Sequence, residues 1–111
     1  MGSRAFREDH PEIARGLQAL WNQDNCPGAS VNVNAGGLVD ADVHLRTYLD
    51  RLPAEFRSQI NYARVGAPAG GGSDNASFAC AGLPAFSLGS LGWNYGSETW
   101  HTERDTYGRT P

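Results

Sequence analysis

The sequence contains no lysine, and all nine of its basic residues are arginine. The 12 acidic residues outnumber them and give a formal net charge of −3, which argues against the basic patch that nucleic-acid-binding proteins carry. No stretch approaches the roughly 18 consecutive apolar residues of a membrane-spanning helix. The polar, acidic residues 1–12 lack the apolar segment of a signal peptide. We therefore expect neither nucleic acid as a partner nor a membrane span.

Cysteine is scarce, with only Cys26 and Cys80 in the chain. Their wide separation fits neither a CxxC motif nor a zinc finger. The two residues either pair in an oxidising compartment or remain buried thiols, and the sequence leaves both alternatives open.

The chain length of 111 residues is that of one small domain, which we place at residues 1–111. The composition, 40% hydrophobic and 19% charged, is typical of a globular protein. Glycine is frequent, with 14 residues that cluster in NAGGL and GAPAGGGSDN. A helical pattern begins abruptly at Ser3. Together these features predict that the chain is a piece of a larger protein.

Hydrophobic periodicity predicts the order of the helices and strands. In the first helix Ser3 is a candidate N-cap and Pro11 allows a break, with an apolar face formed by Ala5, Phe6, Ile13, Ala14 and Leu17. Asp40 caps the clearest helix, whose apolar stripe is Val43, Leu45, Leu49 and Leu52, and Pro53 ends or restarts it. The expected helices are residues 3–18, 40–60 and 73–82, and the expected strands are residues 17–24, 30–36, 60–65 and 83–90.

This alternation of helices and strands predicts an α/β fold, a partial mixed β-sheet flanked by helices. In such folds functional sites form at the carboxyl ends of strands. Asp24 ends the first expected strand, Ser73 and Asp74 follow the loop after the third, and His101 lies in the loop after the last.

The convergence of these residues has two chemical interpretations. Asp24 and His101 are suitable ligands for a divalent metal such as zinc. They also match two members of a nucleophile triad whose third member would be Ser73, although the sequence has no GxSxG elbow. Plain structural roles are open as well. Asp24 suits a turn cap, Ser73 or Asp74 a helix N-cap, and Trp93, Tyr95 and Trp100 are either core residues or the wall of a pocket.

The stretch GGGSDNASFACAGLPAFSLGS, followed by an aromatic loop and WHTERDT, resembles the C-terminal part of co-catalytic zinc exopeptidases. This is the family of bacterial leucyl aminopeptidase and aminopeptidase Y, which is related to glutamate carboxypeptidase. Its members carry a Ser-Asp segment that opens a short helix, then Gly-[Ile/Leu]-Pro-Ala, then His-Thr-x-x-Asp-Thr. LWNQDN is similar to the family strand that ends in an aspartate ligand, and GSRAFREDHPE to the helix after the family's Glu-Glu pair. The resemblance covers nearly the whole chain.

The resemblance implies the C-terminal part of a zinc-exopeptidase fold and a peptidase, specifically an aminopeptidase, with two zinc ions and a peptide substrate. Asp24 would be a terminal ligand of one zinc and His101 of the other, with Asp105 supporting His101. The residues that would line the substrate cleft are Gly72, Ser73, Asp74, Tyr95 and Trp100. Trp100 stands where some relatives have a tyrosine, and Asn75 stands where histidine is frequent.

Two family segments have no counterpart in this sequence. They are the His-x-Asp segment, whose aspartate bridges the two metals, and the Glu-Glu pair, which supplies the general base and a further ligand. We therefore expect the chain to be inactive on its own. The alternative is a truncated or degenerate domain that serves as a binding or assembly module. Relatives are often secreted or periplasmic, which gives the only indication of compartment.

Overall fold

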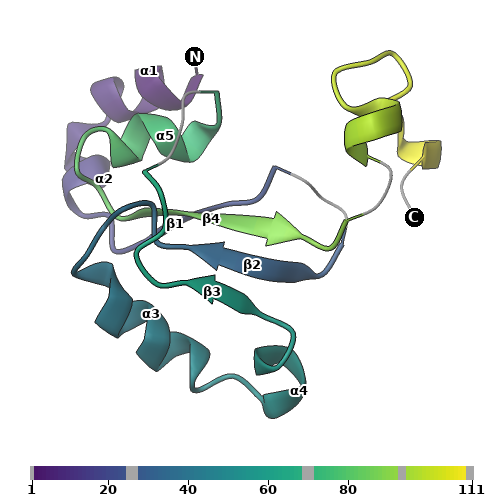
Figure 1. Ribbon diagram of the computed structural model, residues 1–111. Coiled ribbons are helices and arrows are strands. Elements are labelled where there is room, and N and C mark those ends of the chain that lie inside the picture. The colour runs from purple at the N-terminus through teal and green to yellow at the C-terminus, as the bar shows by residue number, and fades with distance from the viewer. Residues whose placement is uncertain (1, 25–27, 69–71, 93–94, 110–111) are drawn as a thin grey trace.

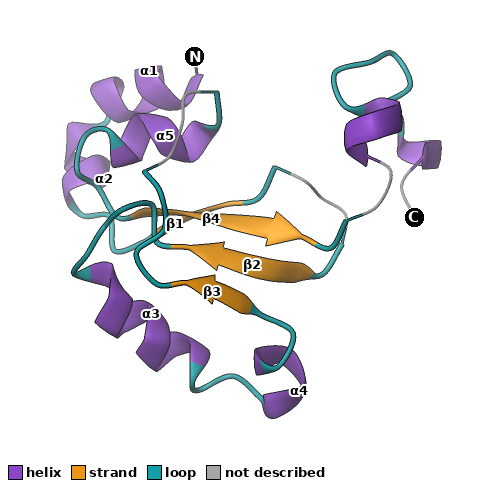
Figure 2. Cartoon of the chain, in the orientation of Figure 1, coloured by secondary structure: helices purple, strands orange, loops and turns teal. Residues whose placement is uncertain are grey.

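The computed structural model describes residues 2–24, 28–68, 72–92 and 95–109 as a four-stranded sheet with helices on both sides (Figures 1 and 2). The helices are α1 (Gly2–Asp9), α2 (Pro11–Arg15), α3 (Ala41–Leu49), α4 (Ala54–Arg57) and α5 (Asp74–Ala79). The strands are β1 (Leu20–Asn22), β2 (Ser30–Asn34), β3 (Asn61–Ala63) and β4 (Ala85–Ser90). Two short helical turns follow, η1 (Tyr95–Thr99, a π-helix) and η2 (Tyr107–Arg109, a 3₁₀-helix).

The sheet has the order β1-β4-β2-β3, with β1 parallel to β4, β2 parallel to β3, and β2 antiparallel to β4. β1 pairs with the first half of β4, so that Asn22 lies opposite Ser87. β2 pairs with the second half and ends with Asn34 opposite the same Ser87. Asn34 in turn lies opposite Ala63 of β3. The carboxyl ends of β1, β2 and β3 therefore reach one level of the sheet, although the strands do not all run the same way.

The two faces of the sheet differ because side chains alternate along each strand. The face toward α3 is apolar, and its buried cluster is Ala35, Leu45 and Phe86 with Leu38, Ala41 and Tyr62 packed against it. The opposite face carries the polar residues Asn22, Asn34 and Ser87 at the level where the three strands end. The sheet thus has a packed side and a polar side, and the candidate site lies toward the polar one.

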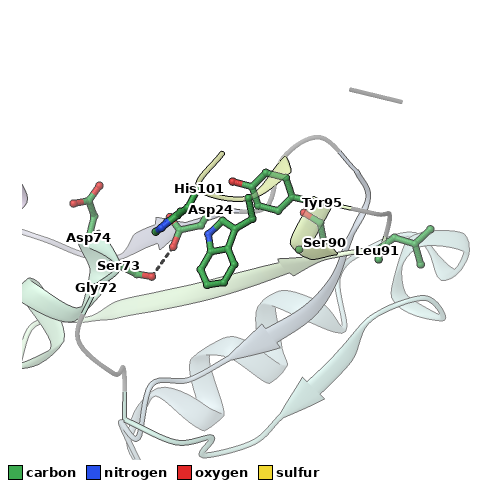
Figure 3. A pocket seen from close by; sticks show the side chains of 11 residues that line it. Asp24, Gly72, Ser73, Asp74, Ser90, Leu91, Tyr95 and His101 are labelled. Carbon is green, nitrogen blue, oxygen red and sulfur yellow. Dashed lines mark hydrogen bonds between the residues drawn. The ribbon is translucent and has the colours of Figure 1, made fainter. Parts of the chain in front are cut away.

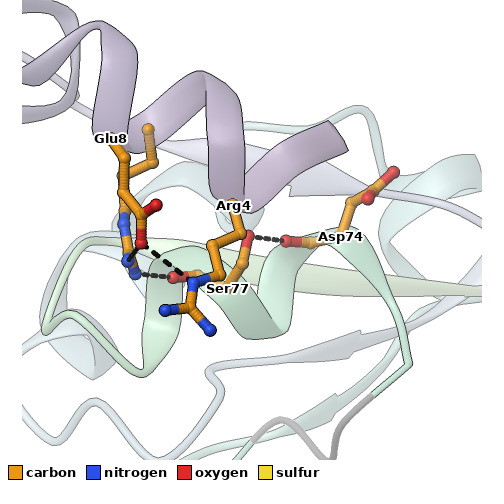
Figure 4. A network of polar contacts seen from close by, with 5 residues as sticks. Arg4, Glu8, Asp74 and Ser77 are labelled. Carbon is orange, nitrogen blue, oxygen red and sulfur yellow. Dashed lines mark hydrogen bonds and ion pairs between the residues drawn. The ribbon is translucent and has the colours of Figure 1, made fainter. Parts of the chain in front are cut away.

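Helices α1 and α5 pack against each other beside β1 and β4 (Figure 1). The guanidinium of Arg7 donates a hydrogen bond to the carbonyl oxygen of Ser77, which joins the two helices (Figure 4). On α1, Arg4 Nε donates to Glu8 Oε1 at 2.9 Å, and this bond holds the pKa of Glu8 below its ordinary value. The hydroxyl of Ser77 donates to the main-chain oxygen of Asp74 at 2.8 Å, within α5. These contacts fix the start of α5, from which part of the site is built.

Helix α3 is held on the other face by apolar packing and by one polar cluster. Leu45 and Leu49 are buried. Tyr62 Oη donates to Asp42 Oδ1 at 3.0 Å, and Arg64 forms an ion pair with the other oxygen of Asp42 at 3.2 Å. Partial burial, with the hydrogen bond to Asp42 second, raises the pKa of Tyr62 to about 12.

The predicted α/β class, with a mixed sheet flanked by helices, is confirmed by this arrangement. The first expected strand is shorter than predicted and begins at Leu20. The helix expected over residues 40–60 divides at Pro53 into α3 and α4, because proline has no N–H to continue the helix. Of the expected stripe, Leu45, Leu49 and Leu52 are buried or half-buried.

Some predicted packing is absent from the structure. Val43 is 69% exposed, since its spacing from Leu45 does not place both on one helix face. On the first helices Phe6 and Ile13 are exposed and Ala14 is buried. The Cys80 thiol is free and exposed, while Cys26 lies outside the described residues. No described helix is long and apolar enough to cross a membrane.

Candidate functional site

An open pocket of about 710 Å³ lies beyond the carboxyl ends of β1 and β4 (Figure 3). Three segments that are distant in the sequence form it: the end of the β1 strand, the start of α5 and the chain after β4. Its lining residues are Asp24, Gly72, Ser73, Asp74, Ser90, Leu91, Gly92, Tyr95, Gly96, Trp100 and His101. The pocket therefore brings together all the predicted metal-binding and substrate-binding residues.

Asp24 is held in place by hydrogen bonds to both of its carboxylate oxygens. Asn22 Nδ2 donates to Oδ1 at 3.0 Å, and Ser73 Oγ donates to Oδ2 at 2.5 Å. A carboxylate has about four lone-pair positions, so these two bonds orient the group and leave acceptor capacity on both oxygens. Because Asp24 is exposed on the pocket wall, this remaining capacity faces the pocket.

The start of α5 supplies the second segment of the pocket. Ser73 stands at the N-cap position in extended conformation, but its hydroxyl makes no capping bond. The hydroxyl binds Asp24 instead, which joins α5 to the end of β1. Gly72 has φ +117°, a conformation that side-chain-bearing residues rarely adopt. Asp74 lines the pocket from the first turn of α5.

His101 lies in the third segment, just after the π-helical turn η1. Its φ of 57° is the only positive φ among the described non-glycine residues. Such a conformation costs about 1 kcal/mol or more and is concentrated at functional sites. The imidazole is exposed and lies against the Trp100 indole, with ring centroids 4.6 Å apart. Figure 3 shows its side chain on the same side of the pocket as those of Asp24 and Ser73.

The turn that carries His101 is fixed by its own hydrogen bonds. The N–H of Trp100 donates to the main-chain oxygen of Tyr95 at 2.8 Å. Thr99 is buried, and its hydroxyl donates to the same oxygen at 3.3 Å. The Thr102 hydroxyl donates to the main-chain oxygen of Thr99 at 2.7 Å. A π-helical turn of this kind is frequent at functional sites, because it displaces side chains from regular helical positions.

Asp105 has a different partner from the one the resemblance implies. Tyr95 Oη donates to Asp105 Oδ2 at 3.5 Å, the long limit for a hydrogen bond. Within the described segments no hydrogen bond joins Asp105 to His101. Burial raises the pKa of the Tyr95 phenol, and the charge of Asp105 adds to the effect. Tyr95 therefore lines the pocket as a neutral phenol that donates its proton to Asp105.

The two predicted metal ligands are of a chemical kind that binds zinc, but two are too few for a catalytic zinc site. Carboxylate oxygen and imidazole nitrogen both bind zinc, but a catalytic zinc takes about three protein ligands. Among the residues that the structure describes, no three His, Cys, Asp or Glu side chains are grouped closely enough to hold a metal ion. The described residues therefore do not form a complete zinc site.

The structure also adds residues to the predicted set. Ser90 lines the pocket and accepts a hydrogen bond from Gln23 Nε2 at 2.8 Å. Leu91 and Gly92 follow it directly. The strand-end rule that identified Asp24 applies equally to the end of β4, so the sequence did contain a signal for them. Nothing in the sequence indicated that Asn22 would orient Asp24. Trp93 lies outside the described residues.

Comparisons of the chain with protein-family models, with curated proteins and with solved structures give no match. The assignment of a function therefore rests on the residues of the pocket and on the sequence motifs. At the level that the structure supports, the chain is a small α/β domain with an open polar pocket at the ends of strands β1 and β4.

Proposed function

We propose that this chain is the C-terminal portion of a zinc exopeptidase of the aminopeptidase type. In this proposal Asp24 and His101 are metal ligands, and the residues that contact the peptide are Gly72, Ser73, Asp74, Tyr95 and Trp100. The observation that carries the proposal is their convergence. Residues assigned from sequence motifs around positions 24, 73 and 101 line one pocket, although the chain separates them widely.

Each residue has a defined task in this proposal. Ser73 and Asn22 orient the carboxylate of Asp24. The left-handed backbone at His101 directs its imidazole, which the Trp100 ring supports. Tyr95 presents a neutral phenol to the pocket wall, and Asp105 accepts its proton in a hydrogen bond. Zinc, when bound by a full set of ligands, would supply Lewis-acid activation.

The proposal requires further ligands and a general base from outside the described residues. We therefore expect the purified chain not to hydrolyse an aminoacyl-p-nitroanilide, with or without added zinc. Hydrolysis that is abolished both by a chelator and by His101→Ala would overturn this expectation.

The assigned ligands can be tested by metal binding without any measurement of activity. Titration of the chain with zinc in the presence of a chromophoric chelator should reveal weak binding. His101→Gln and Asp24→Asn should each weaken it about tenfold or more, because each change removes the ligand that this chain supplies to one of the two ions. His44→Gln is the matched control, since His44 is an exposed histidine outside the pocket. Equal zinc affinity in His101→Gln and His44→Gln would remove His101 from the metal site.

A second candidate function is a non-catalytic binding or assembly module. It is favoured by the absence of a three-ligand cluster among the described residues. The two candidates predict different sizes for the native protein. An immunoblot of the source cells with an antibody to this chain should give a band well above 11.9 kDa for a peptidase portion, and a band at 11.9 kDa for a separate module.

A serine hydrolase built on Ser73 is disfavoured by the geometry. The Ser73 hydroxyl donates its proton to Asp24, whereas a nucleophilic serine donates to a histidine base. We expect no labelling of the chain by a fluorophosphonate reagent.

A further inference from the structure

A second, smaller pocket of about 200 Å³ lies next to the candidate site, and its lining residues other than Ser73 have no role in the proposed peptidase function. Its lining residues are Asn34, Gly36, Ala67, Pro68, Ser73, Asn75 and Ser87. Ser73 lines both pockets. We call this second cavity the asparagine pocket.

The polar side chains of the asparagine pocket are brought together by sheet register and by α5. Asn34 and Ser87 are direct partners across the antiparallel β2–β4 pair, so their side chains are neighbours on one face of the sheet. Asn75 comes from the first turn of α5. Three elements thus deliver two carboxamides and the Ser87 hydroxyl to one small cavity, which Ser73 also lines.

Asn75 carries the inference because it is buried without a partner. Its exposed fraction is 3%, and no described residue makes a hydrogen bond to its side chain. A carboxamide offers two N–H donors and an acceptor oxygen, and leaving them unpaired in a protein interior is costly. The other buried polar residue among those described, Thr99, has its hydroxyl satisfied by Tyr95. Such an unpaired group in a native structure calls for an explanation, and a ligand bound in the adjoining pocket supplies one.

The remaining groups of the pocket define what that ligand must offer. Asn34 Oδ1 accepts the N–H of Gly36 at 2.7 Å, so its amide nitrogen is the part left for the pocket. The Ser87 hydroxyl both donates and accepts. None of the described residues that line the cavity is charged, so a buried ionic ligand would find no counter-charge among them. The ligand group is therefore neutral, compact, and both a donor and an acceptor.

We propose that the asparagine pocket binds a neutral amide group, which pairs with the carboxamide of Asn75. An amide donates through N–H and accepts through C=O, and so satisfies both ends of the Asn75 side chain at once. The amide is either that of a peptide main chain or that of a side-chain carboxamide. The proposal does not depend on hydrolysis or on a metal, and it stands if the chain is a non-catalytic module.

The test is a titration of the ¹⁵N-labelled chain with small amides, followed by ¹H–¹⁵N correlation spectra in the presence of a chelator. N-methylacetamide represents a peptide bond and acetamide represents a side-chain carboxamide. We expect saturable shifts of the Asn75 and Asn34 side-chain NH₂ signals at millimolar concentrations. The amide that binds more tightly shows whether the natural ligand group is a peptide bond or a side-chain carboxamide. Because metal is excluded, a negative result leaves the peptidase proposal intact.

Variants and charged analogues complete the experiment. Asn75→Leu should weaken amide binding about tenfold or more, since it removes both hydrogen bonds. Ser87→Ala should weaken it less. Asn61→Ala is the matched control, because Asn61 is an exposed asparagine of the same sheet outside the pocket, and it should bind normally. Three results would each overturn the proposal: no saturable shift, acetate binding as tightly as acetamide, or undiminished binding by Asn75→Leu.

Discussion

Replacing the buried Asn75 by leucine should stabilise the protein, contrary to the usual effect of a core substitution. The side chain is 3% exposed, and the described residues give its carboxamide no hydrogen-bond partner. An unpaired polar group in the interior costs about 1–3 kcal/mol, and leucine has nearly the same shape without that cost. We expect the free energy of unfolding to rise by about 1 kcal/mol. For a domain of this size, that change corresponds to an increase of about 4 °C in Tm.

Urea unfolding monitored by circular dichroism measures this change, and an unchanged m-value shows that the comparison is valid. Thr99→Val is the matched control. Thr99 is equally buried, but its hydroxyl donates to the main-chain oxygen of Tyr95 at 3.3 Å. Its loss should lower the free energy of unfolding by about 1 kcal/mol. If Asn75→Leu is destabilised as much as Thr99→Val, the carboxamide of Asn75 is satisfied in the folded protein. The reasoning that made its pocket a binding site then fails.

Further predictions concern core packing, the pH dependence of stability and one glycine turn. Leu49→Ala should lower the free energy of unfolding by about 2–5 kcal/mol, because Leu49 is 1% exposed. Val43→Ala on the same helix should change it by less than about 0.5 kcal/mol, because Val43 is exposed. Urea unfolding measures both changes. The folded pKa of Tyr62 is about 12 and that of an unfolded tyrosine about 10, so its contribution to stability is complete below about pH 10 and is lost as the pH rises toward 12. Tyr62→Phe should flatten the decline in unfolding free energy over that range, and an unchanged decline would contradict the assignment. The hydrogen-bonded ion pair with Arg64 lowers the pKa of Asp42, so the contribution of Asp42 to the free energy of unfolding is present above about pH 4 and is lost in acid. Asp42→Asn should therefore make that free energy less sensitive to acid. Gly66→Ala should lower the thermal midpoint, because φ at Gly66 is +65° and an added Cβ would meet a neighbouring side chain of β2.

The sequence predicts most elements of this fold because their patterns are local. Leu45, Leu49 and Leu52 follow helical spacing and are buried or half-buried, and the breakers around residues 82–84 mark the boundary between α5 and β4. The direction of β2 was not predictable in this way. The alternation in SVNVN is compatible with a parallel or an antiparallel neighbour, and only the long-range pairing with β4 sets the direction of β2.

The sequence predicts which residues line the candidate site, but it does not predict the contacts between them. The strand-end rule and the family motifs select Asp24, Ser73 and His101, and these residues do line one pocket. The hydrogen bond from Ser73 to Asp24 and the left-handed backbone at His101 depend on how separate segments meet. The same holds for Asp105, whose contact with Tyr95 differs from the one that the family pattern implies.

The position of β4 determines when this sheet can form. β4 is the last of the four described strands and lies inside their sheet, where it pairs with both β1 and β2. Among these strands β1 has no partner until Ala85 has been made, and β2 can pair only with β3. A two-stranded ribbon of this kind is at best marginally stable, so the four described strands would not form their sheet in a chain that stops before Ala85. Until β4 has been made, β1 and one edge of β2 lack their partner within this sheet.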